Sequence, residues 1–263
     1  MTILTTHVGS LPRPKNVSDL LFKRENNEVY EQKYFDEVIS NGVYEVVKKQ
    51  IDIGIDIISD GEMSKISYAT YVKDRYNGFA GDSERNPPLD LEKFPNYMQK
   101  IADSGGTPTY SRPCCVSEIA SKHNNDLSND INNLLSASKK FKHKNIFMNS
   151  ASPGVISLFL SNSYYSSRNE YLEAISKAMK DEYETIVRSG IKLQLDCPDL
   201  ALSRHMTFKS KSDEDFIKIA YQNMEILNQS LHNISPEMLR LHVCWGNYEA
   251  VSYTHLRAHE TRF

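Results

Sequence analysis

Short apolar runs alternate with amphipathic stretches along the whole of this 263-residue chain. The runs are rich in β-branched and aliphatic residues and mostly end at Gly, Pro or Asp, a pattern that predicts short buried strands. Apolar residues between the runs recur with the period of a helix. Six strands are predicted, at residues 3–8, 55–59, 114–117, 145–150, 192–196 and 239–244.

Three of the amphipathic stretches carry helix end signals. A helix is predicted over residues 168–189, because one face is apolar and Gly190 follows as a terminator. Ser212 and Asp215 have the spacing of a capping box, which predicts the start of a second helix. A third helix is predicted over residues 43–53.

Alternation of strands and helices predicts parallel βα units. A doubly wound sheet and a (β/α)8 barrel both satisfy this pattern. Nucleotide-binding folds are disfavoured, because no glycine-rich phosphate-binding motif follows a strand. The polar, tyrosine-rich segment 65–111 is predicted as a long loop over the strand ends rather than a separate domain.

Composition narrows the partners and the compartment. The net charge of −3 and the pI near 6.3 give no reason to expect a nucleic-acid or membrane partner. The chain has neither an apolar run of about 20 residues nor a secretory signal pattern, so a cytoplasmic location is expected. Four cysteines are too few for a disulfide framework.

Unusual chemistry stands at four predicted strand ends, namely Thr6–Ser10, Ser59–Glu62, Gln194–Asp199 and the pair His242 and Cys244. Taken singly, these segments are ordinary turns or weak metal motifs. Parallel strands, however, bring their carboxyl ends to one edge, where ligands bind. An imidazole and a thiol two residues apart on a strand also face the same side, and both are ligands that zinc prefers. The four segments therefore predict one shared pocket with half of a metal site.

Four motifs give the chain a recognisable resemblance: TTHVGSLPRP at 5–14, DGEMSK at 60–65, QLDCPD at 194–199 and LHVCWGNYE at 241–249. In this order the chain resembles the cobalamin-independent methionine synthase family, in its short single-barrel branch. The resemblance implies a (β/α)8 TIM barrel of the methionine synthase and uroporphyrinogen decarboxylase type. It also implies zinc-dependent transfer of a methyl or alkyl group from a small-molecule donor to a small-molecule thiol, as from 5-methyltetrahydrofolate to homocysteine.

The resemblance also implies roles for individual residues. The turn Val8, Gly9 and Ser10 matches the family's binding site for the carboxylate of the amino-acid thiol. Glu62 and Asp196 match the acidic residues that contact its ammonium group, and His242 and Cys244 match paired zinc ligands. No catalytic residue is assigned, and no role follows for His7, Asp199 or His205.

Two departures from the family pattern keep other functions open. The synthases have Asp-Glu-Pro where this chain has Asp196, Cys197 and Pro198, and Tyr-Ser-x-Phe where it has residues 245–248. The alternatives are an epoxide-to-thiol transferase of the coenzyme M type, a metal-free decarboxylase like uroporphyrinogen decarboxylase, and a non-catalytic thiol- or corrinoid-binding partner.

The last residues do not continue the family's barrel. Residues 251–263 resemble a translated sequencing adapter, so they are predicted to be a non-native tail after an incomplete barrel over residues 1–250. About six of eight strands would then be present. The family's remaining zinc ligands, a Glu and a Cys, are expected downstream. Because a catalytic zinc needs three protein ligands, this chain is predicted to be an inactive or poorly folded fragment.

Overall fold

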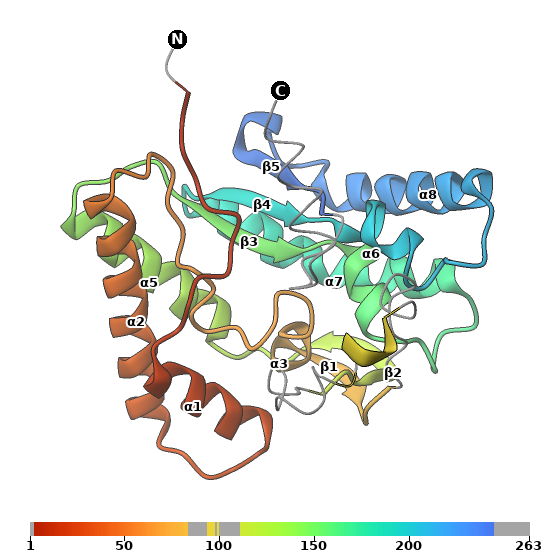
Figure 1. Ribbon diagram of the computed structural model, residues 1–263, viewed down its shortest axis with the longest axis horizontal. Helices are drawn as coiled ribbons and strands as arrows, with labels where there is room; N and C mark the ends of the chain where they lie inside the picture. Colours follow the sequence, from red (N-terminus) through yellow and green to blue (C-terminus); the bar gives the residue numbers. More distant parts are fainter. Residues whose placement is uncertain (1–2, 84–93, 98, 100–110, 245–263) are drawn as a thin grey trace.

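The computed structural model describes residues 3–83, 94–97, 99 and 111–244. The predicted domain boundary at residue 250, the predicted tail 251–263 and the motif residues 245–249 lie outside the described residues. Helices and strands alternate in this α/β fold (Figure 1).

A parallel sheet forms the centre of the fold. It contains β3 (Phe147–Ala151), β4 (Lys192–Asp196) and β5 (Leu239–His242), in that order. All five residues of β3 are buried, as expected for a sheet covered on both faces.

Two earlier segments of the chain extend the sheet beyond β3. Ile58 forms a parallel bridge with Ile146, and Thr6 forms one with Ile57. Five parallel segments therefore lie side by side in chain order, and their carboxyl ends share one edge. The predicted strands at 3–8 and 55–59 are thus placed correctly, although each is reduced to isolated bridges.

Helices connect and cover these segments. The prediction for residues 168–189 is confirmed by α7 (Arg168–Arg188), and the predicted capping box opens α8 (Asp213–Leu231), where Ser212 accepts a hydrogen bond from the Asp215 N–H. The helix predicted over residues 43–53 is longer, because α2 covers Gln32–Asp52. Further helical segments are α1 (Lys15–Glu25), α3 (Val72–Arg75), α5 (Asp126–Lys140), α6 (Pro153–Phe159), η2 (Pro198–Leu200), η3 (Leu202–Arg204) and η4 (Pro236–Met238).

The core lies between the sheet and its helices. Phe147 and Leu193 of the sheet and Leu172, Met179 and Tyr183 of α7 are fully buried. Complete burial of one such side chain stabilises the fold by roughly 1.5–3 kcal/mol. The apolar face predicted for α7 is therefore the one that anchors the helix on the sheet.

The prediction that residues 114–117 form a strand of the parallel array is wrong. These residues begin β2 (Cys114–Ser121), which pairs antiparallel with β1 (Tyr76–Ala80) in a separate two-stranded sheet. Gly78 takes a φ of 104° where the register shifts, and a Cβ there would lie 2.9 Å from the Glu118 carbonyl oxygen. Part of the segment predicted as a loop, 65–111, is therefore strand β1 and helix α3.

The five parallel segments of the described region form an open array and not a closed barrel. The α/β class is confirmed, whereas the (β/α)8 barrel stays a prediction. Arg240 of β5, at one edge, reaches across to Thr6 Oγ1 at the other at 3.3 Å, so the array is strongly curved.

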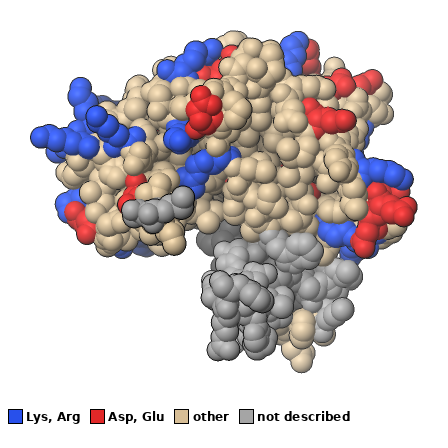
Figure 2. All heavy atoms as spheres, turned by 90° about the horizontal axis from the view of Figure 1, so that it is seen from above, with Lys and Arg blue, Asp and Glu red and all other residues tan. Residues whose placement is uncertain are grey.

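The surface of the described residues carries both signs of charge. Figure 2 shows acidic and basic side chains toward the ends of one face, with mostly uncharged atoms between them. None of the helices in the described ranges has the length and apolarity needed to span a bilayer.

Candidate functional site

Glu62 lies on the tight turn that follows the Ile57–Ile58 segment, and it is only 2% exposed. Its φ of 55° is in the left-handed region, which a non-glycine residue adopts at a cost of about 1–3 kcal/mol. The surrounding contacts hold it there. Asp60 accepts its N–H at 3.0 Å, Arg13 donates to its carbonyl at 3.0 Å, and Ser10 donates to its carboxylate at 2.7 Å. Strain maintained by so many contacts is typical of functional sites.

Gly9 lies directly against this carboxylate. A Cβ at Gly9 would lie 2.4 Å from Glu62 Oε1 and 2.7 Å from Asn149 Nδ2, so no larger residue fits without displacing them. The backbone N–H groups of Gly9 and Ser10 donate to no acceptor among the described residues. Two such N–H groups beside each other can bind a carboxylate.

Asp196 ends β4 and is 4% exposed. Its carboxylate accepts hydrogen bonds from Asn149 Nδ2 at 3.1 and 3.2 Å and from Gln194 Nε2 at 3.0 Å. Both amides also donate to the Val8 carbonyl, at 3.2 and 2.6 Å. These bonds tie the first segment of the array to β3 and β4, and they bring the predicted residues Val8, Gly9, Glu62 and Asp196 together.

Burial dominates the electrostatics of the two acids. It raises the pKa of Glu62, and the nearby Asp196 carboxylate raises it further, whereas Lys65, Ser10 and Arg13 lower it. Burial also raises the pKa of Asp196, against the hydrogen bonds from Gln194 and Asn149. Two neighbouring buried carboxyl groups attract a cation, because a cation stabilises the charged form that burial disfavours.

His242 and Cys244 lie beside Asp196, where β5 ends. The parallel register pairs His242 with Asp196, and the His242 carbonyl accepts the Cys197 N–H at 2.8 Å. Both side chains are half-buried. The part of the chain that the structure describes contains no group of three His, Cys, Asp or Glu residues able to hold a metal ion. These two donors are of the kinds that zinc prefers, but they do not complete a zinc site by themselves.

A cavity of about 210 Å³ lies beyond the ends of β3 and β4. Asp199 lines it together with Arg168, and its buried carboxylate accepts hydrogen bonds from Ser152 and Asn223 at 2.8 Å each. This cavity offers room for a small molecule, but neither Glu62 nor Asp196 lines it. His7 and His205 are half-buried.

Sequence reasoning missed Asn149, Gln194 and Lys65. Asn149 and Gln194 are polar residues within buried strands, a signal that was available in the sequence. Lys65 ends the DGEMSK motif, and its ammonium donates to the Asn149 carbonyl at 2.6 Å.

The fold and the site define an α/β protein with two buried acids, Glu62 and Asp196, at the carboxyl ends of parallel strands. Beside them lies the Gly9–Ser10 turn, whose backbone N–H groups donate to no acceptor among the described residues. A family model, described as the catalytic domain of cobalamin-independent synthase, matches residues 3–86. The methionine synthase of Sulfolobus acidocaldarius is 26% identical over 251 residues, and that of Saccharolobus islandicus is 23% identical over 249 residues. Each match covers 94% of this chain.

Solved structures share the fold. A B12-independent methionine synthase from Shewanella sp. W3-18-1, in complex with selenomethionine, superposes with a TM-score of 0.65 at 17% identity, covering 97% of this chain and 64% of that one. A structure described as a vitamin-B12 independent methionine synthase from Listeria monocytogenes gives a TM-score of 0.62 at 17% identity, covering 96% of this chain and 70% of that one. The resemblance to the cobalamin-independent methionine synthase family is confirmed. The chain spans only 63–64% of the length of the two archaeal relatives.

Proposed function

We propose that this chain forms the amino-acid thiol site of a methyl- or alkyltransferase of the methionine synthase type. The likeness to methionine synthases supports methyl transfer at the level of the family. Closure into a (β/α)8 barrel is part of the proposal. So is the identity of the two small-molecule substrates, a thiol such as homocysteine and a methyl donor such as methylfolate.

One observation carries the proposal: the Gly9–Ser10 turn meets the buried carboxylates of Glu62 and Asp196. An α-amino acid presents a carboxylate and an ammonium group on one carbon. We assign the carboxylate to the free N–H groups of Gly9 and Ser10, and the ammonium to Glu62 and Asp196. Each charge-assisted contact of this kind contributes about 1.5–3 kcal/mol.

His242 and Cys244 are proposed to hold zinc together with ligands from outside the described residues. When bound, zinc ionises a coordinated thiol and so supplies a nucleophile at neutral pH. Because these two donors are fewer than the three that a catalytic zinc needs, we propose that the described residues by themselves bind the amino acid but do not turn it over.

The test is calorimetric titration of the 263-residue chain with three thiols. L-homocysteine carries both charged groups, 4-mercaptobutanoic acid lacks the ammonium, and 3-aminopropane-1-thiol lacks the carboxylate. We expect each truncated thiol to bind about 10–100-fold more weakly than L-homocysteine, because each loses one charge-assisted contact.

Variants locate the effect in the acidic pair. Glu62→Gln and Asp196→Asn are expected to remove the preference for L-homocysteine over 4-mercaptobutanoic acid. Glu45→Gln, which changes an exposed carboxylate on α2, serves as the matched control. Equal affinity for all three thiols, or full preference in both site variants, would rule the proposed function out.

A further inference from the structure

Lys65 is a buried cation beside the proposed amino-acid site, and neither the family resemblance nor the site geometry gave it a role. Its side chain is 3% exposed. The ammonium donates to the Asn149 carbonyl at 2.6 Å and lies 4.3 Å from the centre of the Tyr71 ring. The backbone N–H of Lys65 donates to the Glu62 backbone carbonyl at 3.2 Å. Lys65 therefore fastens the turn that carries Glu62 to β3, the strand that carries Asn149.

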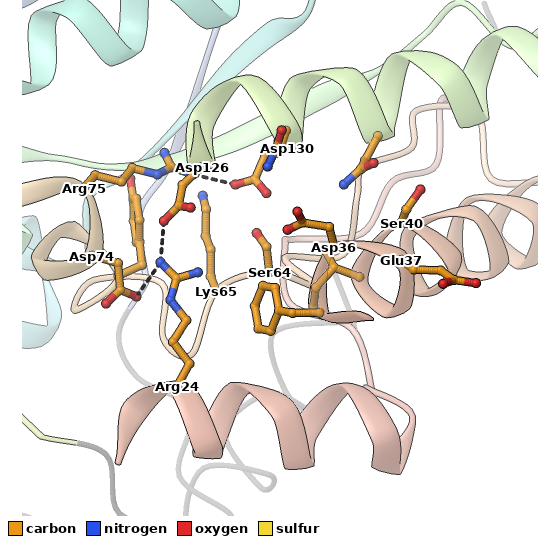
Figure 3. Close-up of a pocket in the computed structure, with 15 residues that line it drawn as sticks. Arg24, Asp36, Glu37, Ser40, Ser64, Lys65, Asp74, Arg75, Asp126 and Asp130 are labelled. Atoms are coloured by element: carbon orange, nitrogen blue, oxygen red, sulfur yellow. Dashed lines mark hydrogen bonds and ion pairs between the residues drawn. The ribbon is translucent and has the colours of Figure 1, made fainter. Parts of the chain in front are cut away.

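The two arginines that line the same cavity as Lys65 already have carboxylate partners. Lys65 lines a cavity of about 330 Å³ with Arg24 and Arg75 (Figure 3). Arg24 forms ion pairs with Asp74 and Asp126, and Arg75 forms ion pairs with Asp130 at 2.5 Å and Glu182 at 2.7 Å. Within the described residues, Lys65 has no ion pair of its own.

The charge of Lys65 is therefore available to interact with the carboxylates of its own turn and of the proposed amino-acid site. The charged groups that face Glu62 are Asp60, Lys65 and Arg13 near its turn and Asp196 from β4. The Arg13 guanidinium donates hydrogen bonds to the backbone carbonyl oxygens of Glu62 and Lys65, at 3.0 and 2.7 Å. Of these groups, Lys65 does most to favour ionised Glu62 over its neutral form, against burial and the charge of Asp196.

We propose that Lys65 is a positioning residue of the amino-acid site, whose buried ammonium fixes the Glu62 turn and keeps Glu62 anionic for the ligand's ammonium group. This inference rests on the proposed function. Without Lys65, the pKa of Glu62 would rise further, and the protonated fraction of Glu62 would lose its charge-assisted contact with the ligand. Removing Lys65 also removes its repulsion of the ligand's ammonium group, which by itself would strengthen binding. This effect is smaller than the loss of the Glu62 charge, because in the proposed site the Glu62 carboxylate touches the ligand and Lys65 does not.

The experiment compares Lys65→Met and Lys65→Arg with the unmodified chain, by calorimetric titration between pH 6 and pH 9. At pH 7, Lys65→Met is expected to bind L-homocysteine at least about 10-fold more weakly, while its affinity for 4-mercaptobutanoic acid changes less than about twofold. The deficit relative to the unmodified chain should shrink as the pH rises, because Glu62 then ionises. Lys65→Arg keeps the charge, and the 330 Å³ cavity gives it room, so it should follow the unmodified profile.

Each outcome decides something. If Lys65→Met weakens both thiols equally at every pH, Lys65 is a structural residue and the inference is wrong, while the proposed function stands. The same holds if Lys65→Met binds L-homocysteine as the unmodified chain does. Should Lys65→Met fail to fold, as judged by circular dichroism, Lys65→Arg still decides, because a shifted pH profile in that variant contradicts the inference. If the unmodified chain does not prefer L-homocysteine over 4-mercaptobutanoic acid, both proposals fail.

Discussion

Gly9→Ala is the smallest change that tests how tightly the candidate site is built. The new Cβ would lie 2.4 Å from Glu62 Oε1 and 2.7 Å from Asn149 Nδ2, and real Cβ atoms essentially never come closer than 3.0 Å to a neighbour. The Glu62 carboxylate must therefore move by about 0.6 Å or more. Its hydrogen bond from Ser10 and its turn resist that movement, and the Asn149 amide is held by Val8 and Asp196.

The size of the effect follows from these contacts. Overpacking a well-filled interior costs about 1–3 kcal/mol, so the free energy of unfolding should fall by that amount. Displacing Glu62 weakens one charge-assisted contact with the ligand, which predicts at least about a 10-fold loss of affinity for L-homocysteine.

Urea denaturation and calorimetric titration measure the two effects separately. Gly42→Ala is the matched control, because a Cβ on this α2 glycine would lie 3.2 Å from Val17 Cγ2, an apolar methyl group outside the site. That variant should change stability by no more than about 1 kcal/mol and leave L-homocysteine binding unchanged. If Gly9→Ala is as stable and binds as tightly as Gly42→Ala, then Gly9 does not touch the binding site and the assignment of the turn is wrong.

Three further predictions concern the buried charges and a helix end. Arg75→Met leaves the buried Asp130 and Glu182 carboxylates without their cationic partner, so it should cost about 3–5 kcal/mol in urea denaturation, and a loss under 1 kcal/mol would contradict the ion-pair assignment. Burial raises the pKa of Asp130 to about 6. Native Asp130 thus holds its proton to higher pH than the unfolded chain does, and its contribution to stability falls as the pH rises from about 4 to 6; Asp130→Asn should flatten this part of the stability curve. Ser212→Ala removes the acceptor for the Asp215 N–H at the start of α8 and should cost about 1 kcal/mol, measured by thermal unfolding, whereas an unchanged melting temperature would mean that the cap is not formed.

The sequence predicted the convergence of the site because that convergence depends only on parallel strand order. Motifs that lie 52 and 186 residues apart along the chain are linked in the structure by the bonds Ser10–Glu62 and Gln194–Val8. Neither bond required the barrel to close. It was enough that each strand runs in the same direction and that each helix returns the chain to the opposite edge.

The sequence-based predictions that failed, for residues 114–117 and for Lys65, also have local physical causes. Residues 114–117 have the composition of a buried strand, but the pairing partner of β2 is β1, which lies far upstream and is not joined to it by a short turn. Register across so long a connection is set by tertiary packing, which periodicity does not report. Lys65 was missed for a related reason, since a lysine in a polar motif is usually exposed, and only the fold shows that this one is 3% exposed.

The acidic pair and the His242–Cys244 pair differ in how far this chain completes them. Described residues support Glu62 and Asp196 through hydrogen bonds from Ser10, Asn149 and Gln194 and through the Asp60 turn. His242 ends β5, the last described strand, which pairs with β4, and Cys244 follows it two residues later. Recognition of the amino acid and activation of its thiol are therefore separable in this chain. In the absence of zinc, His242→Ala and Cys244→Ala should each lower the affinity for L-homocysteine by no more than the loss of one contact with the ligand. Glu62→Gln, in contrast, should abolish the preference for a ligand with an ammonium group, whether or not zinc is supplied.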